Sequence, residues 1–287
     1  MPRPARAGVS RKDFPELTSR ALAVTPIARA QTIPSAWYVD PRFHTLERSA
    51  VFGATWQLAV RADQVADRGQ FAVATVGENP VIVVRDAEGT LRAFYNVCRH
   101  RGGPLATCDG TGTVLKCHYH GWTYRLDGSL RGVPAFDRVE LFDKKDFGLV
   151  PVAVAVWQGL VFVNLGADPA PLTTPMTGIV ERIQPQTLTT KVFRRRAAYD
   201  VACNWKVYVD NYLEGYHVPH VHPELTKLYD YQKYVTEVFP WYSLQHSPLS
   251  EEPTAYSGSG GGTAFYYWVF PNLMLNILPG RLQTNLV

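Results

Sequence analysis

The sequence reads Cys98-Arg-His100-Arg-Gly-Gly-Pro and later Cys117-His-Tyr-His120-Gly-Trp, with sixteen residues between His100 and Cys117. Each stretch supplies one cysteine and one histidine, spaced C-x-H in the first and C-x2-H in the second. Because thiolates and imidazoles are metal ligands, the pattern predicts a site where two cysteines and two histidines converge on metal. Glycines at positions 102, 103 and 121 let backbone N–H groups approach the ligand sulfurs.

Two kinds of metal centre use this ligand set. A structural zinc site is usually built from C-x2-4-C and H-x3-5-H pairs. A Rieske [2Fe–2S] cluster has two cysteines on one iron and two histidines on the other. Since each stretch here supplies one ligand of each type, each loop reaches across both metals, which favours the iron–sulfur cluster. Structural zinc is the alternative.

Length and composition exclude several classes of protein. The chain has 287 residues, enough for two domains of roughly 100–200 residues each. It has no run of about 18 apolar residues, so we expect no transmembrane helix and no membrane partner. A net charge of +4 with scattered lysines and arginines does not indicate nucleic-acid binding. Four cysteines are too few for a disulfide scaffold, so Cys108 and Cys203 are expected to be buried or inert thiols in a reducing, cytoplasmic setting.

Short β-like runs separated by turn signals begin near residue 50. The runs are residues 56–60, 70–76, 81–84, 114–116, 122–126 and 159–165. Residues 77–80 and 86–89 read as turns, and Asp127-Gly128 is a hairpin signal. We therefore predict a small antiparallel β domain over residues 50–166, with both Cys/His stretches in loops between its strands.

The flanking segments have a different character. Residues 1–33, rich in arginine and proline, read as a disordered arm, with a transit peptide as the alternative. Asp40-Pro41 begins a predicted helix with Phe43, Leu46, Ala50 and Val51 on one face. The Pro/Thr-rich residues 168–175 mark a domain boundary. Beyond it, residues 176–287 form a second domain with helices at 178–183 and 204–216, strands at 189–201, 235–247 and 265–278, and a flexible loop at 257–262.

A second group of ligand-type residues lies at Asp210-Asn-Tyr-Leu-Glu214-Gly-Tyr-His217-Val-Pro-His220-Val-His222. On a helix, Asp210, Glu214 and His217 share one face, at i, i+4 and i+7. Pro219 disfavours helical geometry at the residue before it, so we expect the helix to end there and the later histidines to fold back in a turn.

Four interpretations of this group compete. A di-iron site needs a second Glu-x-x-His pair, which the sequence lacks. A zinc site would use His217, His220 and His222. A mononuclear Fe(II) site would use two histidines and one carboxylate. Histidines without metal are the default for any single one, but three within six residues beside an acidic helix face disfavour it. Asp210 lies about 10 Å along the helix from His217, too far to be a ligand.

Both stretches resemble motifs of the Rieske non-haem iron oxygenases. Cys98-x-His100-Arg-Gly and Cys117-His-Tyr-His120-Gly-Trp resemble the family's Rieske motif. Respiratory and photosynthetic Rieske proteins carry an extra cysteine in each loop, which forms a disulfide. Here Tyr119 precedes the second histidine, so that disulfide cannot form and Cys108 is expected to be unpaired. The absence of the disulfide favours a lower-potential, oxygenase-type cluster.

The second stretch resembles the mononuclear iron motif of the same family, Asn-x-x-(Asp/Glu)-x-x-His-x4-His. The resemblance implies that His217 and His222 bind iron and that Asn211 is a polar neighbour of the metal. It implies that Glu214 links His217 to His120 of a neighbouring subunit. The family's third ligand is an aspartate nearer the C-terminus, and no acid after His222 has that context. We therefore expect a C-terminally truncated chain, with the third ligand beyond Val287.

The resemblance implies an α+β fold, with an antiparallel β Rieske domain followed by an incomplete helix-grip-like catalytic domain to which residues 1–49 contribute an arm and a helix. It implies a [2Fe–2S] cluster and mononuclear Fe(II) as cofactors. The implied protein is the catalytic α subunit of an oxygenase, often a homotrimer, that hydroxylates a small organic substrate with O2. NAD(P)H electrons would arrive through a separate flavin or iron–sulfur reductase or a ferredoxin.

The substrate and the docking surface are less well determined by the sequence. The second stretch looks closest to choline, glycine betaine and carnitine monooxygenases, which attack carbon beside a quaternary ammonium. Four aromatic residues are candidates for a cage around such a cation, although strand packing is favoured: Tyr266, Tyr267, Trp268 and Phe270. Aromatic-ring dihydroxylation and demethylation stay open, as does a Rieske electron carrier or inactive fragment. Five basic residues form either a docking face for an acidic electron donor or, as we favour, a solvated rim: Arg99, Arg101, Lys116, Arg125 and Arg131.

Overall fold

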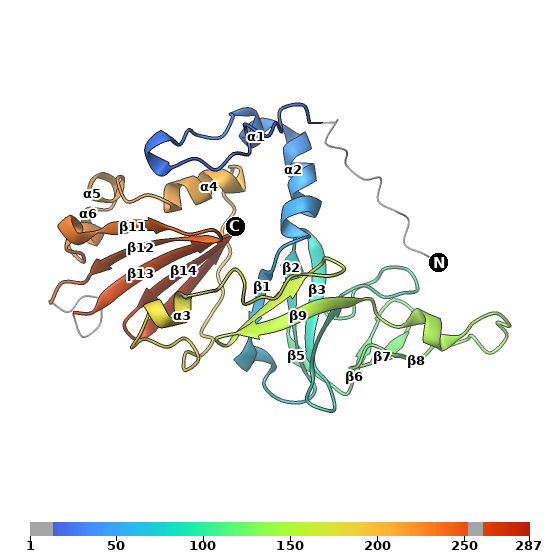
Figure 1. Ribbon diagram of the computed structural model, residues 1–287. Helices are drawn as coiled ribbons and strands as arrows, with labels where there is room; N and C mark the ends of the chain where they lie inside the picture. Colours follow the sequence, from blue (N-terminus) through green and yellow to red (C-terminus); the bar gives the residue numbers. More distant parts are fainter. Residues whose placement is uncertain (1–13, 252–260) are drawn as a thin grey trace.

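The structure, a computed structural model, describes residues 14–251 and 261–287, which form two β-rich domains packed side by side (Figure 1). The first domain contains a seven-stranded antiparallel sheet in the order β1-β10-β9-β4-β3-β2-β5. Its strands are β1 (Gln57–Arg61), β2 (Gln70–Val76), β3 (Asn79–Arg85), β4 (Leu91–Tyr95), β5 (Gly110–Thr111), β9 (Pro151–Trp157) and β10 (Leu160–Asn164). The predicted antiparallel β domain is confirmed.

A separate three-stranded sheet carries the second Cys/His stretch. It consists of β6 (Val114–Lys116), β7 (Thr123–Arg125) and β8 (Leu130–Gly132). The predicted hairpin at Asp127-Gly128 joins β7 to β8, where Gly128 has φ of 90° and Asp127 Oδ1 accepts a hydrogen bond from the backbone N–H of Ser129. A Cβ atom on Gly128 would lie 2.5 Å from the Phe94 ring, so this glycine lets the small sheet pack closely on β4.

The second domain is built on a five-stranded antiparallel meander, β11-β12-β13-β14-β15. Its strands are β11 (Val235–Val238), β12 (Tyr242–Pro248), β13 (Thr263–Val269), β14 (Leu273–Leu278) and β15 (Arg281–Leu286). The strands expected at 235–247 and 265–278 are therefore each split into two by a turn. Residues 257–260 of the expected flexible loop lie outside the described residues.

One face of this meander packs against the first domain. Leu244, Tyr267 and Leu275 project from that face and are fully buried. They share one apolar cluster with Leu58 and Phe162 of the first sheet. The short helix α3 (Ile179–Arg182) contributes Ile179 to the same cluster, as expected for a helix near residues 178–183. The two domains therefore share a hydrophobic core.

Three helices cover the opposite face of the meander (Figure 1): α4 (Trp205–Tyr212), α5 (Val218–Val221) and α6 (Pro223–Thr226). The Tyr212 hydroxyl donates to Asn276 Oδ1 on β14 at 2.6 Å, and Asn285 of β15 donates to the Tyr208 hydroxyl at 3.4 Å. These bonds hold α4 on the sheet. None of the helices in residues 14–251 and 261–287 is long and apolar enough to cross a membrane.

The N-terminal segment lies over α4 from the other side. Helix α1 (Ala36–Val39) is followed by α2 (Pro41–Glu47), which Asp40 caps by accepting a hydrogen bond from the backbone N–H of Arg42, as predicted. The chain then makes a π-helical turn, η3 (Arg48–Phe52), before β1. This wider turn changes the spacing, so the predicted apolar face is wrong in part: Ala50 is exposed, while Glu47 is buried.

Short 3-10 segments complete the chain: η2 (Ile27–Arg29), η4 (Ala62–Val65), η5 (Lys144–Phe147) and η6 (Tyr231–Lys233). Residues 1–13 of the expected arm lie outside the described residues. Residues 14–33 are mostly exposed, although Phe14 is buried against Phe43 at a ring-centroid distance of 5.2 Å. Cys108 and Cys203 are exposed free thiols, so burial, one of the two states expected for them, is wrong.

The strand expected at residues 189–201 is wrong. This segment runs along β1 without joining it in a ladder. Side chains link the two instead: Asp63 accepts from the Phe193 N–H, Arg61 donates to the Lys191 carbonyl, and Arg196 of the segment donates to the Ala59 carbonyl of β1. Because these side chains occupy the backbone groups, the β-branched and aromatic residues of the segment form no strand.

Candidate metal centres

The two Cys/His loops have the same backbone turn. In each, the N–H of a glycine four residues after the cysteine donates to the cysteine carbonyl at 3.0 Å: Gly102 to Cys98, and Gly121 to Cys117. Both glycines have φ of 76°, which side chains other than that of glycine rarely adopt. The first loop follows β4 and the second joins β6 to β7, so strands of both sheets position the four candidate ligands.

The two cysteines lie near one another, and so do the two histidines. Cys98 and Cys117 are buried, and the thiols lie close enough to interact directly. A Cβ atom on Gly103 would lie 3.1 Å from the Cys117 sulfur, so the first loop passes directly over the second cysteine. The rings of His100 and His120 lie 4.7 Å apart, edge to face. His120 is exposed.

Burial sets the electrostatics of this pocket. It raises the pKa of the Cys98 thiol, although a hydrogen bond with the Tyr124 hydroxyl, 3.3 Å from the sulfur, opposes the rise. Burial also lowers the pKa of His100, with smaller contributions from His120 and Arg101. Trp122 stacks on the His100 ring at 4.9 Å and shields it from water. The uncharged imidazole that metals require is therefore favoured at His100.

The donor set fits a two-iron cluster better than a single ion. His100 Nδ1 is buried and has no hydrogen-bond partner, which costs about 1–3 kcal/mol unless a metal occupies it. Within residues 14–251 and 261–287, no three His, Cys, Asp or Glu side chains converge on one point as ligands of a single ion do. A tetrahedral zinc site would require four such ligands. A Rieske cluster requires only two protein ligands per iron.

The second site forms where α4 ends. The predicted helix over residues 204–216 stops at Tyr212, so Asp210, Glu214 and His217 do not share a continuous helix face. Pro219 does not end a helix either, because it lies in the first turn of α5, where its missing N–H is not needed. Despite the different backbone, the His217 and His222 rings lie 5.3 Å apart, at the two ends of α5.

Glu214 organises the turn between α4 and α5, residues 213–217, which we call the metal turn. Its carboxylate accepts hydrogen bonds from the backbone N–H groups of Tyr216 and His217, and Oε1 lies 2.6 Å from His217 Nδ1. Burial raises the pKa of Glu214, but these hydrogen bonds outweigh that effect and lower it overall. An ionised Glu214 keeps the proton on Nδ1 and leaves Nε2 of His217 free for metal. Two imidazoles with a carboxylate behind one of them fit an Fe(II) site.

Tyrosines from the meander side hold the metal turn. The Tyr231 hydroxyl donates to the Gly215 carbonyl at 2.9 Å. A Cβ atom on Gly215 would lie 2.8 Å from the Tyr234 ring, so only glycine fits there without a shift. Gln245 of β12 donates to the Tyr212 carbonyl, which closes the end of α4. Burial raises the pKa values of Tyr212 and Tyr234, so these phenols stay protonated.

The remaining predicted residues have simpler environments. Asn211 is exposed on α4 and His220 is exposed on α5. Asp210 accepts a hydrogen bond from the Tyr38 hydroxyl at 2.5 Å, which agrees with its exclusion as a ligand. The role of Tyr124 was missed in the sequence, although buried Trp122, Tyr124 and Leu126 alternate with more exposed residues over β7 and the residues on either side of it.

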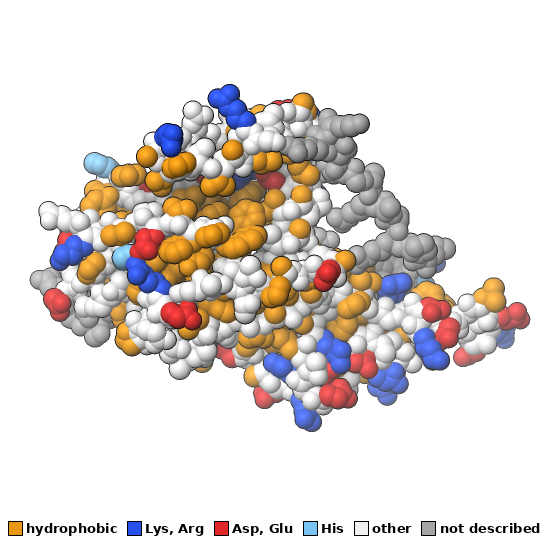
Figure 2. Space-filling view, viewed as in Figure 1, with side chains coloured by type: hydrophobic (Ala, Val, Ile, Leu, Met, Phe, Trp, Pro, Cys, Tyr) orange, Lys and Arg blue, Asp and Glu red, His pale blue; other side chains and the backbone are white. Residues whose placement is uncertain are grey.

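The two sites lie at opposite ends of the molecule (Figure 1), one beside β6–β8 and the other beside α4 and α5. In Figure 2, charged side chains of both signs gather over the first domain, whereas apolar side chains gather over a hollow in the second. Exposed acids such as Asp137 and Glu140 lie on the β8–β9 connection, after the exposed basic residue Arg131. This mixed charge favours a solvated rim over a purely basic docking face.

Two family models match the two domains. Residues 55–143 match the Rieske [2Fe-2S] domain. Residues 188–287 match the catalytic domain of the ring hydroxylating alpha subunit.

Curated relatives and solved structures agree with these matches. The chloroplastic choline monooxygenase of Arabidopsis thaliana is 35% identical over 96% of this chain and 68% of its own length. The carnitine monooxygenase oxygenase subunit of Acinetobacter baumannii is 32% identical over 88% of this chain and 69% of its own length. A solved quaternary ammonium Rieske monooxygenase superposes with a TM-score of 0.80 at 29% identity, covering 85% of this chain and 68% of that chain. Other plant choline monooxygenases are matched over a smaller share, such as 57% of that from Beta vulgaris.

The antiparallel α+β architecture with two domains agrees with these matches, as does the pairing of a Cys2His2 pocket with a two-histidine site. The family's cofactors are a Rieske [2Fe–2S] cluster and a mononuclear iron, and both donor sets fit them. The chain therefore belongs to the Rieske non-haem iron oxygenases, with the Rieske domain and the catalytic domain of their α subunits.

Proposed function

We propose that this chain is the oxygenase component of a Rieske-type system that uses O2 to hydroxylate a small quaternary ammonium compound. One observation carries the proposal: the same chain holds a buried Cys2His2 pocket and a histidine pair oriented by Glu214. An electron carrier needs only the first of these sites.

At the first site, Cys98 and Cys117 would hold one iron of the cluster and His100 and His120 the other. The bound cluster supplies electrons one at a time. The chain's own residues would control its surroundings: Trp122 covers one face of the His100 ring, and the Tyr124 hydroxyl, 3.3 Å from the Cys98 sulfur, would donate a hydrogen bond to the thiolate. His120 is exposed and would provide the edge through which electrons leave.

At the second site, His217 and His222 would hold the mononuclear Fe(II), which supplies O2 activation when bound. Glu214 fixes the tautomer and orientation of His217, and we assign Asn211 as a polar neighbour of the metal. No carboxylate in residues 14–251 and 261–287 joins the two histidines as a third ligand.

We propose that electrons pass between two copies of the chain. The two sites lie at opposite ends of one copy (Figure 1), and both His120 and Glu214 are accessible at the surface. In a head-to-tail homotrimer, His120 of one subunit would contact Glu214 of the next and pass electrons on to His217. The electrons would come from NAD(P)H through a separate flavin or iron–sulfur reductase or a ferredoxin.

The substrate assignment rests on the relatives and on aromatic residues near the metal turn. Relatives named for choline, carnitine and glycine betaine support a quaternary ammonium, and such cations bind to aromatic faces. The four residues suggested from the sequence cannot form one cage, because Tyr267 is buried in the interdomain core on the opposite face from Tyr266. We propose instead that Tyr266 acts with Tyr229 and Tyr234. The Tyr229 ring lies 6.1 Å from that of Tyr266 and 6.2 Å from that of Tyr234, which contacts the metal turn at Gly215.

Iron content and product analysis test the proposal. After anaerobic reconstitution, an oxygenase should contain about three irons per chain and an electron carrier about two. Replacing His217 with alanine should remove about one iron and leave the reduced-cluster electron paramagnetic resonance signal intact. A content of two irons, insensitive to His217, would instead support the carrier.

Substrate class is tested by turnover with an unrelated electron donor. We expect 18O from 18O2 to appear in products of choline, carnitine or glycine betaine. We expect none from 3,3-dimethylbutanol, in which carbon replaces the cationic nitrogen of choline. Incorporation into naphthalene but not into the ammonium compounds would favour ring dihydroxylation.

We also propose a cytoplasmic location, in keeping with the thiol ligands and the reducing setting they need. The plant relatives are described as chloroplastic, so the location is a separate proposal. Cell fractionation with an antibody against the chain tests it.

A further inference from the structure

A buried ion pair joins the N-terminal helix α2 to the helix that precedes the metal turn. Glu47 is the last residue of α2 and Lys206 lies in the first turn of α4, and each is only 8% exposed. Glu47 Oε1 lies 2.6 Å from Lys206 Nζ. Its other oxygen accepts a hydrogen bond from Trp205 Nε1 at 2.7 Å. Both carboxylate oxygens of Glu47 therefore bind side chains of α4.

Further contacts between the same two segments surround this pair. The Lys206 ammonium lies 5.1 Å from the Trp205 ring and 5.9 Å from the Tyr38 ring. Asn204, which caps α4 by accepting from the Lys206 N–H, also donates to the Tyr38 carbonyl at 3.0 Å. Tyr38 then donates to Asp210 in the last turn of α4. The N-terminal segment thus holds α4 at both of its ends.

Stability alone does not explain a charged pair at this position. Removing two charges from water costs several kcal/mol each, and well-packed apolar residues often stabilise a fold as well or better. A buried ion pair differs from apolar packing in one respect: it offsets its desolvation cost only when the two charged groups keep a close distance and a good orientation. Since a helix turns about 100° per residue, a small rotation of α4 would pull Lys206 away from Glu47. The pair therefore fixes the rotation of α4 about its axis.

The rotation of α4 matters because the metal turn follows it directly. Tyr212 ends α4, and Glu214 lies two residues later with its carboxylate on His217. A metal site needs its ligands held within about 0.5 Å of the productive geometry. We propose that Glu47 and Lys206 are positioning residues, which set the rotation of α4 and through it the separation and aim of His217 and His222. This inference rests on the proposed function, since it takes these histidines to be metal ligands.

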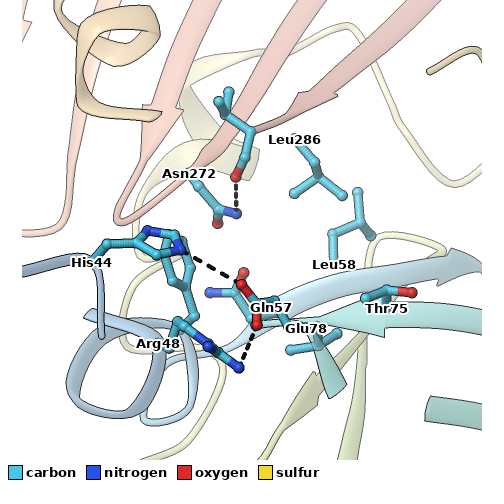
Figure 3. A pocket seen from close by; sticks show the side chains of 12 residues that line it. His44, Arg48, Gln57, Leu58, Thr75, Glu78, Asn272 and Leu286 are labelled. Atoms are coloured by element: carbon cyan, nitrogen blue, oxygen red, sulfur yellow. Dashed lines mark hydrogen bonds and ion pairs between the residues drawn. The ribbon is translucent and has the colours of Figure 1, made fainter. Parts of the chain in front are cut away.

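Helix α2 is also tied to the Rieske domain (Figure 3). His44 Nε2 lies 3.5 Å from Glu78 Oε1 in the turn between β2 and β3, and Arg48, the first residue after α2, pairs with the other oxygen of Glu78. These groups line a crevice of about 320 Å³. Unlike Glu47 and Lys206, these side chains are about half exposed, so their ion pairs contribute little to fixing the position of α2. They supply a control contact near the same end of the same helix.

The test compares folding with metal binding in one set of variants. Glu47→Gln keeps the shape and the acceptor for Trp205 but leaves the Lys206 charge unpaired, so both stability and Co(II) binding should fall. Glu47→Gln combined with Lys206→Met removes both charges. We expect the double variant to recover the wild-type thermal midpoint but to keep a Co(II) affinity about tenfold weaker, with altered Co(II) d–d absorption bands. The Rieske cluster's visible circular dichroism should not change in any of them.

Milder and control variants complete the set. Tyr38→Phe, which removes only the hydroxyl bound to Asp210, should weaken Co(II) binding in the same direction by a smaller factor. Glu78→Gln should leave Co(II) binding unchanged. If the double variant, or Tyr38→Phe where the double variant does not fold, binds Co(II) with wild-type affinity and spectrum, the positioning role is refuted. If wild-type Co(II) binding does not depend on His217, the proposed function falls together with this inference.

Discussion

The loops that present Cys98 and Cys117 are held by hydrogen bonds to glycines four residues away, whereas the metal turn is held by residues far along the chain. Tyr212 bonds to Asn276, 64 residues later, and Lys206 pairs with Glu47, 159 residues earlier. The first site is thus formed by local turns that follow strands of the two sheets of the first domain. The second forms only when three separate segments have packed together, so its geometry is more sensitive to distant substitutions.

The largest expected effect tests the independence of the two sites. Cys117→Ser removes a buried thiolate from the first site, so we expect loss of the whole cluster, about two irons per chain. The metal turn shares no residue with this pocket, so His217-dependent Co(II) binding should persist. Iron analysis and Co(II) titration of the same sample measure both quantities. Concurrent loss of Co(II) binding would show that the sites depend on each other.

The next prediction tests the long-range support of the metal turn. Gly215→Ala places a methyl group 2.8 Å from the Tyr234 ring, which must move and take the turn with it. We expect metal affinity at His217 and His222 to fall by about 10–100-fold, with the cluster unaffected. Gly132→Ala is the control, because a Cβ atom there meets nothing within 4 Å. Equal affinities for the two variants would contradict the proposed role of Tyr234.

A pH prediction concerns the local framework of the first domain. Asp86, in the turn between β3 and β4, is fully buried, and its hydrogen bonds from Arg92 and from the Thr90 N–H outweigh burial and lower its pKa. A carboxyl whose folded pKa is depressed stabilises the fold above its unfolded pKa, about 3.9, and loses that contribution as pH falls. Asp86→Asn should therefore cost about 1–3 kcal/mol near pH 7.

The unfolding free energies of wild type and Asp86→Asn, measured by urea titration between pH 3 and 7, check this prediction. Their difference should stay constant from about pH 7 to 5 and shrink below about pH 4. A difference that grows as the pH falls would contradict the ionised state of Asp86 in the folded protein.

The smallest expected effect refines the description of the first site. Tyr124→Phe removes the hydroxyl that lies 3.3 Å from the Cys98 sulfur. Because that hydrogen bond favours the more negative, reduced cluster, its loss should lower the reduction potential by about 40 mV, equivalent to about 1 kcal/mol for one electron. Potentiometric titration followed by circular dichroism measures the change. An unchanged potential would assign Tyr124 to packing alone.

The contrast between local and long-range support explains what could be predicted from the sequence. The strands around both Cys/His loops follow from alternating patterns and turn residues such as Asp127-Gly128, which act over a few positions. The prediction that this helix extends to residue 216 was wrong, because tertiary contacts decide where α4 ends. Gln245 and Tyr231 take the carbonyls of Tyr212 and Gly215, so the helix does not continue to residue 216.

Burial of Glu47 is another feature that the local pattern does not contain. From sequence alone, an acidic residue at a helix end is predicted to be exposed. The ion pair with Lys206 offsets the free-energy cost of burying the Glu47 carboxylate. The segment at 189–201 differs for a similar reason, since side chains such as Asp63 and Arg196 bind backbone groups that a strand would need. The burial of Tyr124, by contrast, could have been predicted from its alternating spacing with Trp122 and Leu126.

The apolar cluster common to the two domains limits how this protein can be divided. Leu58, Leu160 and Phe162 belong to the Rieske sheet, yet they are buried against the meander. A Rieske domain expressed alone would present these side chains to water as a continuous apolar patch and would tend to aggregate. Polar replacements at those positions should rescue such a fragment, whereas in the intact chain the same replacements should make the two halves melt separately rather than in one transition.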